Sequence, residues 1–221
     1  MKIYNNRKIL LFGLISVPIM TFLLAIKESP FNYTFSMIGN WFDYRTEFII
    51  WGIFTGILLT IFLIHLYKKT EFRNKKSFRF AYASGIFLIL SVITPTTREP
   101  VEKALREPHF DLHLVWSLAF IVFFLVSLCL FSKYLSYINK NLSIKSLRFL
   151  LISVGGSIFL LTFFGMTGIF ELFFFVSVSI YLIIIEKDLT KIKKRLKINK
   201  NTNGKDGRKK ATTHRRKFSK T

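Results

Sequence analysis

The chain has 221 residues; 51% of them are hydrophobic, 26 are Phe, and 33 Lys and Arg outnumber 12 Asp and Glu. This composition excludes an ordinary water-soluble domain, because the long apolar stretches leave too little chain to form a polar shell. The single cysteine, Cys129, excludes a disulfide framework. We therefore expect an all-α integral membrane protein.

Six apolar stretches predict six membrane-spanning helices. In chain order they cover residues 9–26, 48–66, 80–93, 112–131, 149–166 and 169–185. A helix needs about 20 mostly apolar residues to cross the hydrocarbon core, and five of the stretches meet that length directly. The third is short and needs flanking residues such as Ser77 to complete the crossing.

The basic residues alternate between the gaps and so predict the topology. Lys and Arg number 3 before the first stretch, 6 between the second and third, 4 between the fourth and fifth, and 15 after the sixth. The remaining gaps hold five. Because cytoplasmic connections carry the excess of Lys and Arg, both termini are expected in the cytoplasm of a multi-pass cell-membrane protein.

The sequence divides into a transmembrane domain, 1–186, and a polybasic tail, 187–221. Apolar residues near the start of the tail recur at helical spacing and predict an amphipathic helix along the inner leaflet. They are Leu189, Ile192, Leu196 and Ile198. After Asn201 we expect disorder. The tail either anchors on anionic lipid, at about 1 kcal/mol per cation, or acts only as a topology signal. Nothing in it predicts nucleic-acid binding.

The first outer connection, 27–48, is too apolar for a solvated loop, so we expect it to fold against the bundle, with Gly39 at a turn. Its polar residues predict a ligand-binding cluster at the outer face, completed by an acidic residue that opens the sixth stretch. The cluster consists of Asn32, Ser36, Asn40, Asp43, Arg45, Glu47 and Glu171.

Glu171 lies in otherwise apolar sequence, and an ionisable residue at membrane depth indicates a functional site that needs a partner. We expect it to point into the bundle, with Arg45, His109 or His113 as that partner. His109 and His113 are four residues apart and share one helical face. With Glu171 they could bind zinc; the other interpretation is a buried polar network without metal. A tight turn at 167–168 is expected before the sixth stretch.

The segment 30–59, PFNYTFSMIGNWFDYRTEFIIWGIFTGILL, together with Pro95 and then His113 leading into the fourth stretch, resembles a bacterial six-span family catalogued as domain of unknown function 998. It resembles the DRAM-like membrane proteins more distantly. The resemblance implies a six-helix bundle with both termini inside, and no particular reaction. Ceramidase and progestin-receptor-like hydrolases are a rival resemblance, but they have seven spans and a late histidine pair that this chain lacks.

The leading functional hypothesis is a non-enzymatic one: the outer aromatic and polar surface binds a lipid headgroup or a partner membrane protein, without a cofactor. The alternative is a zinc-dependent intramembrane lipid hydrolase in which His109, His113 and Glu171 hold the metal. Ser36 or Asp43 would then assist a metal-bound water. A transporter has little support, because no inverted repeat or matching pair of broken spans occurs.

Overall fold

The computed structural model describes residues 7–95 and 108–218, with side chains described for 9–95 and 112–195. The regular secondary structure of these residues is entirely α-helical, which confirms the predicted all-α class. In chain order the helices are α1 (Arg7–Ala25), α2 (Phe35–Trp41), α3 (Arg45–Lys69), α4 (Lys75–Ile93), α6 (Pro108–Ile138), α7 (Lys140–Phe164) and α8 (Gly168–Phe218).

The chain divides into two compact units, Met1–Ile183 and Ile184–Thr221. The first contains the helix bundle and the start of α8, and the second contains the continuation of α8 to Phe218. The sequence predicted disorder after Asn201, whereas the backbone is helical there. No proline interrupts the chain after Pro108, and its many Lys and Arg residues are good helix formers.

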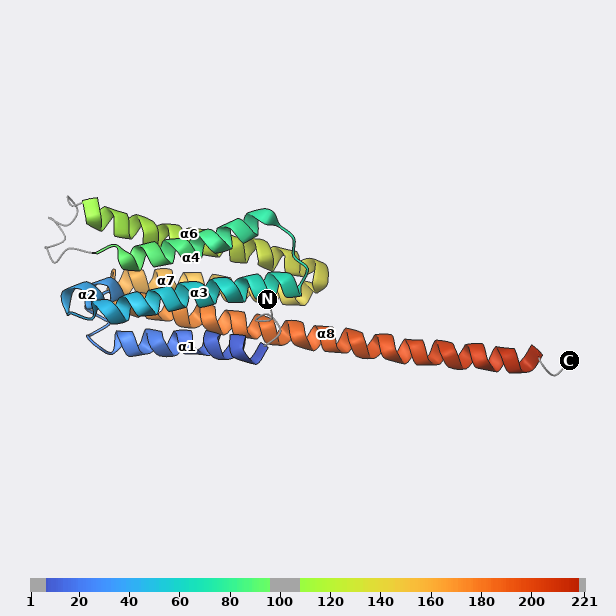
Figure 1. The fold of residues 1–221 in the computed structure, drawn as a ribbon. Coiled ribbons are helices and arrows are strands. Elements are labelled where there is room, and N and C mark those ends of the chain that lie inside the picture. The colour runs from blue at the N-terminus through green and yellow to red at the C-terminus, as the bar shows by residue number, and fades with distance from the viewer. Residues whose placement is uncertain (1–6, 96–107, 219–221) are drawn as a thin grey trace. The chain divides into compact units, whose positions relative to one another are not determined.

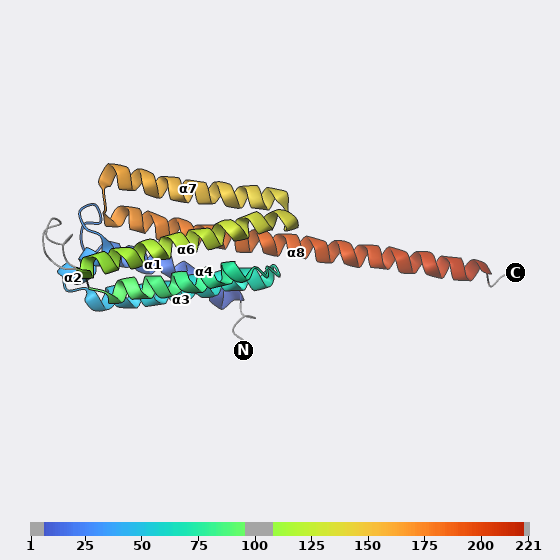
Figure 2. The same cartoon turned by 90° about the horizontal axis from the view of Figure 1, so that it is seen from above.

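Within the first unit the long helices lie side by side, with axes close to parallel or antiparallel (Figure 1, Figure 2). Helix α3 packs against α1 and α4, α4 packs against α6, and α6 packs against α7. The short helix α2 packs against α1 and α3 at one end of the bundle, which we call the α2 end. Antiparallel neighbours follow from the short connections between consecutive helices.

In the described part of the chain, five helices are long and apolar enough to cross a membrane. They are Arg45–Lys69, Lys75–Ile93, Leu112–Ile138, Lys140–Phe164 and Gly168–Arg195, and Ile9–Ala25 is a shorter apolar helix. These five to six helices match the predicted apolar stretches. The third stretch, short in sequence, is completed by residues on its N-terminal side, because α4 begins at Lys75.

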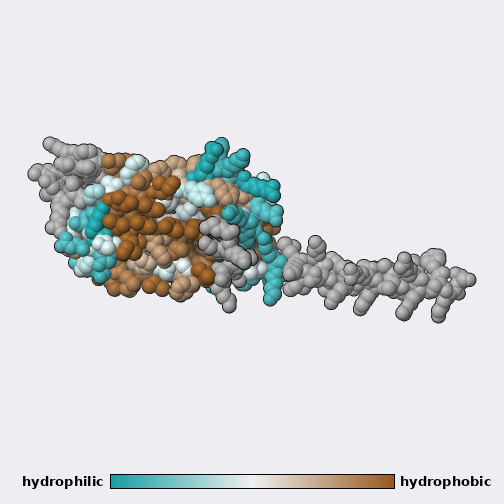
Figure 3. All heavy atoms as spheres, in the orientation of Figure 1, coloured by the Kyte–Doolittle hydropathy of each residue, from teal (hydrophilic) through white to brown (hydrophobic). Residues whose placement is uncertain are grey.

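The outside of the bundle is apolar around its middle. Figure 3 shows a hydrophobic band on one face, bordered by hydrophilic residues at both ends. Large apolar side chains face outward, and Phe12 on α1 and Leu151 on α7 are 76% and 72% exposed. Soluble monomers rarely expose so much contiguous apolar surface. The protein is therefore embedded in a membrane.

Local polar residues decide where the helices begin and end. The Asn74 side chain accepts hydrogen bonds from two amides in the first turn of α4, and Asn139 accepts one from the Leu142 amide at 3.0 Å. These caps satisfy amides that have no partner inside the helix. Helix α7 ends at Gly165, whose φ of 71° favours glycine. The connection to α8 therefore comprises residues 165–167. It begins two residues before the turn predicted at 167–168, and Gly168 already belongs to α8.

Two groups of buried hydroxyls join helices across the apolar core. The Tyr67 hydroxyl lies 2.6 Å from Ser127 Oγ, which donates to the Ser77 carbonyl and so connects α3, α6 and α4. The Tyr181 hydroxyl lies 3.0 Å from Ser132 Oγ and 2.8 Å from Ser146 Oγ, which connects α8, α6 and α7. Buried hydroxyls are tolerated in apolar surroundings because they pair with one another. The Tyr181 group thus joins α7 to α6 and α8 toward the end of the bundle opposite α2.

Candidate functional site

The first connection of the bundle folds as expected against the helices. Thr34 caps α2 by accepting a hydrogen bond from the Met37 amide at 3.2 Å, and Phe35 and Ile38 are buried. Two carbonyl oxygens of the connection also accept from the first turn of α8: Gly168 N donates to Tyr33 O at 2.7 Å, and Ile169 N donates to Pro30 O at 2.8 Å. Those α8 amides have no partner inside their own helix. The segment before α2 is therefore fastened to the start of α8.

The prediction that Gly39 forms a turn is wrong. Gly39 lies inside α2 and is buried, and a Cβ atom on it would come 2.6 Å from Phe48 Cβ on α3. The glycine is needed for a close approach of two helices rather than for a special backbone angle. Among the described residues between α1 and α3, the positive φ belongs to Asp43, at 64°, between α2 and α3.

Glu171, in the first turn of α8, points into the bundle toward the first connection, as predicted from the sequence. Its Oε2 atom accepts a hydrogen bond from the Phe35 amide at 2.7 Å. Phe35 is the first residue of α2, so this amide has no partner inside the helix. Glu171 therefore caps a helix that lies 136 residues away in the sequence.

Arg45, one of the three candidate partners that the sequence offered for Glu171, is bonded elsewhere. Its guanidinium donates instead to the Asn40 side-chain oxygen and to the Ile93 carbonyl oxygen at the end of α4. Asn40 in turn donates to the Ser36 carbonyl at 2.7 Å. These bonds tie α2, α3 and α4 together. Arg45 thus has a structural role at the α2 end, while the carboxyl group of Glu171 is bonded to a main-chain amide.

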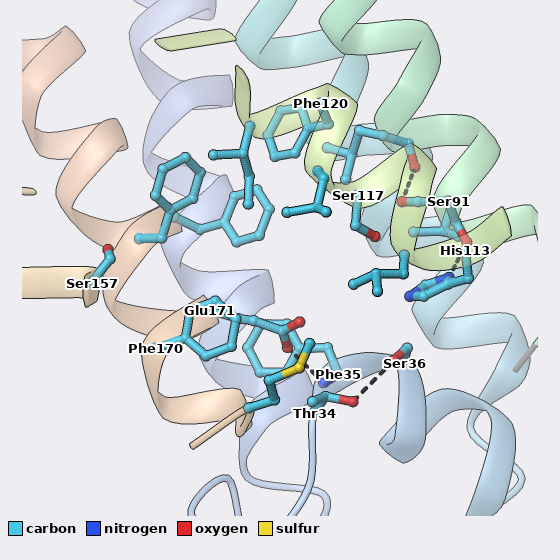
Figure 4. Close-up of a pocket in the computed structure, with 18 of the residues that line it drawn as sticks. Thr34, Phe35, Ser36, Ser91, His113, Ser117, Phe120, Ser157, Phe170 and Glu171 are labelled. Atoms are coloured by element: carbon cyan, nitrogen blue, oxygen red, sulfur yellow. Dashed lines mark hydrogen bonds between the residues drawn. The ribbon is translucent and has the colours of Figure 1, made fainter. Parts of the chain in front are cut away.

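His113, in the second turn of α6, contacts the end of α4. Its Nδ1 atom lies 2.7 Å from the Ser91 carbonyl oxygen. A carbonyl can only accept, so Nδ1 carries a proton, and in the neutral ring Nε2 is left as an acceptor. Figure 4 shows that the Glu171 and His113 side chains point toward each other across a cavity.

The third predicted zinc ligand, His109, lies outside the described side chains. Among the side chains that the structure describes, no group of three or more His, Cys, Asp and Glu could hold a metal ion. The zinc site therefore stays a prediction, although His113 and Glu171 line one cavity.

The cavity has a volume of about 610 Å³ and lies between α2, α3, α4, α6, α7 and α8 at the α2 end. Ser36, Ser117, His113 and Glu171 are among the polar residues that line it. Most of the wall is apolar and includes aromatic rings from several helices. These rings belong to Phe35, Trp41, Phe48, Trp51, Phe120, Phe170, Phe174 and Phe175. The site therefore combines a small polar group with a large apolar lining, as ligand pockets commonly do.

The cavity opens on the apolar side of the bundle. Leu118 on α6, Ile158 on α7 and Met166 after α7 line it, and these side chains are 53%, 57% and 55% exposed. They belong to the apolar surface of membrane-spanning helices. A molecule in the surrounding lipid could therefore enter sideways, without crossing the polar end of the protein.

The structure brings together part of the cluster that the sequence predicted. Ser36 and Glu171 line the cavity, and Asn40 and Arg45 support α2 beside it. Three members of the predicted cluster are exposed and lie outside the lining: Asn32, Asp43 and Glu47. The sequence interpretation missed Ser117 and the aromatic wall. Ser117 follows His113 by four residues, so helical periodicity places both on one face and could have indicated it.

No protein-family model matches the chain, and neither a curated protein nor a solved structure is similar to it. The resemblance carried by residues 30–59 therefore stays a prediction. The cavity at the α2 end, with Glu171 and His113 on facing walls, is the feature from which a function can be argued.

Proposed function

We propose that this protein binds a lipid in the cavity at the α2 end. The observation that carries the proposal is one enclosed space with a polar group, an apolar wall and an opening on the lipid-facing side. The polar head of the lipid would lie beside Glu171, His113 and Ser117. Its chain would lie among the apolar residues of α6, α7 and α8. Binding of this kind requires neither a cofactor nor a reaction.

A zinc-dependent lipid hydrolase is the second candidate, and one observation favours it. His113 and Glu171, two of the three predicted metal ligands, line the same cavity, and the Nε2 atom of His113 is available to a metal when the ring is neutral. Elemental analysis of the purified protein distinguishes the two candidates. One zinc per chain supports the hydrolase, whereas protein without zinc that still binds lipid supports simple binding.

The proposal includes a topology: six spans in the cell membrane, with the α2 end outside and both termini in the cytoplasm. The distribution of basic residues supports it, because Lys and Arg are concentrated in residues 67–79 and 132–148, the connections and adjoining helix ends of α3–α4 and α6–α7, at the end opposite α2. The resemblance to the six-span family fits the same arrangement. The basic tail would then contact anionic lipid at the inner surface.

Cysteine labelling tests this topology in intact cells. In a Cys129→Ser background, an impermeant maleimide is expected to modify Thr46→Cys and to spare Lys75→Cys. Both positions are exposed. Thr46 lies at the start of α3, at the α2 end, and Lys75 lies at the start of α4, at the opposite end of the bundle. Permeabilised cells provide the control, since both cysteines should then react. Preferential labelling of Lys75→Cys in intact cells would reverse the proposed orientation.

Lipid binding is expected to quench tryptophan fluorescence. Trp41 and Trp51 line the cavity, whereas Trp116 stacks on Phe87 elsewhere, so Trp116→Phe removes a background signal. A single-chain lipid with a brominated chain should quench the remaining fluorescence saturably in a non-brominated, uncharged detergent. Val154→Phe places a larger side chain in the apolar wall of the cavity. It should weaken lipid binding about 10-fold, because overpacking the occupied cavity costs roughly 1–3 kcal/mol.

Leu151→Phe is the matched control for this measurement. Leu151 lies one helical turn from Val154 on α7, but it faces outward and does not line the cavity. Its replacement should leave the binding curve unchanged. If the quenching does not saturate, or if Val154→Phe and Leu151→Phe reduce it equally, the lipid only coats the protein surface.

A further inference from the structure

We propose that the head group bound in this cavity is a protonated primary amine carried by a single-chain amphiphile. The inference rests on the proposed lipid binding and adds the chemical class of the ligand. It depends on three features of the site: the charge of the lining, the hydrogen-bonding atoms that point into the space, and the volume.

The lining has an acidic group and no strongly basic one. Of the described residues that line the cavity, none is Lys or Arg, whereas Glu171 contributes a carboxyl group. Among the described residues no Lys, Arg or His forms an ion pair with Glu171, and its one hydrogen bond uses Oε2. The other oxygen, Oε1, is left for a ligand. A carboxylate in low-dielectric surroundings is stabilised by a cation, and here that cation would come from the ligand.

The neighbouring polar groups also match an ammonium. In its neutral form His113 presents Nε2 as an acceptor, because Nδ1 donates to the Ser91 carbonyl. Among the described residues the Ser117 hydroxyl has no hydrogen-bond partner, and Figure 4 shows it directed into the cavity between Glu171 and His113. A primary ammonium has three N–H donors. Glu171, His113 and Ser117 can each accept one of them.

An anionic head group would fit poorly at the same place. A phosphate or a carboxylate would lie beside Glu171 with like charge and would find no guanidinium or ammonium in the described lining. Arg45, the basic residue that the sequence placed in this cluster, is bonded to Asn40 and to the Ile93 carbonyl and does not line the cavity. The site therefore selects for positive charge.

The cavity volume suits a head group and one chain, and a second chain would have to lie outside the opening on the lipid-facing side. If each non-hydrogen atom takes the roughly 30 Å³ that a water molecule occupies in the liquid, the space accommodates about 20 atoms, given a cavity of about 610 Å³. A lipid with two long chains has many more atoms than that. The apolar wall formed by α6, α7 and α8 would hold the single chain.

Four brominated probes with one chain length test the inference in the Trp116→Phe protein: a primary amine, a trimethylammonium, an alcohol and a carboxylic acid. At pH 7 a primary amine is protonated, since such amines have a pKa near 10. The amine is expected to bind about 10-fold or more tightly than the alcohol, as charge-assisted hydrogen bonds are stronger than neutral ones. The carboxylic acid should bind most weakly. The trimethylammonium should bind less tightly than the amine, because it has no N–H donor.

Glu171→Gln separates charge from hydrogen bonding. Glutamine keeps an acceptor for the Phe35 amide but removes the negative charge, so the advantage of the amine over the alcohol should disappear. Ser117→Ala is a second variant, expected to weaken the amine several-fold and to weaken it more than the trimethylammonium, which has no N–H donor. Val154→Phe, expected to weaken each probe about 10-fold, is the control that the quenching reports binding in the cavity.

The outcomes distinguish the two proposals. Equal affinities for all four probes, tightest binding of the acid, or an amine preference that persists in Glu171→Gln would overturn the amine assignment and leave lipid binding intact. No saturable quenching by any probe would overturn the lipid binding itself. If Glu171→Gln does not fold, the order of the four probes on the parent protein still decides the question.

Discussion

Gly39→Ala is expected to lower the melting temperature of the purified protein and to weaken lipid binding. The new Cβ atom would come 2.6 Å from Phe48 Cβ and 2.7 Å from Phe48 Cγ. These atoms lie next to the α3 backbone, so they cannot move away as the tip of a flexible side chain can. Helix α2 must therefore shift. Overpacking of this kind costs roughly 1–3 kcal/mol, or about 2–10 °C for a protein of this size.

Gly155→Ala is the matched control for this substitution. Gly155 lies inside α7, and a Cβ atom there would meet nothing within 4 Å. The alanine should leave the melting temperature unchanged or raise it, because glycine in a helix interior costs up to about 1 kcal/mol relative to alanine. Circular dichroism during heating in detergent measures both variants. Equal melting temperatures would contradict the tight packing of α2 on α3.

Glu171→Leu is expected to destabilise the protein, and Glu171→Gln much less so. Leucine leaves the Phe35 amide without the acceptor that now lies 2.7 Å away. An unpaired buried donor costs about 1–3 kcal/mol, and the loss of a bond to a charged group lies toward the upper end of that range. Glutamine has the same length as glutamate and keeps a side-chain oxygen that can accept the hydrogen bond from the Phe35 amide. The comparison thus isolates the role of Glu171 as the cap of α2.

Thermal unfolding of the ligand-free protein measures this effect, and the lipid titration of each variant measures the other role of the carboxyl group. Glu171→Leu should lose both stability and the preference for an amine, whereas Glu171→Gln should lose only the preference. If the leucine variant is as stable as the parent protein, Glu171 does not cap α2. If both variants are equally destabilised, the charge rather than the hydrogen bond stabilises this end of the bundle.

The segment on which the predicted family resemblance rests forms much of the site. Residues 30–59 include the Thr34 cap, all of α2 and the first half of α3. Within it, Ser36, Trp41 and Trp51 line the cavity. The Trp51 indole also donates to the Thr21 hydroxyl on α1 at 2.9 Å, so the segment joins the cavity wall to the first helix. Residues 30–59 thus build the α2 end.

The amino-acid sequence by itself determined the all-α class, the apolar helices and their insertion in a membrane. These properties depend on the length and composition of continuous segments, which can be read locally. It also indicated that the apolar connection before α3 folds against the bundle, and that Glu171 points inward. A carboxyl group at the start of an apolar helix is poorly placed anywhere else.

Only the tertiary structure decided which groups meet at the α2 end. Glu171 pairs with the Phe35 amide rather than with Arg45 because α2 begins against α8, a contact between residues 136 positions apart. Gly39 is required by the nearness of Phe48, which no turn signal in the sequence reveals. The cavity likewise arises from the spacing of six helices. Such features depend on how side chains pack between distant segments, and local patterns do not contain that information.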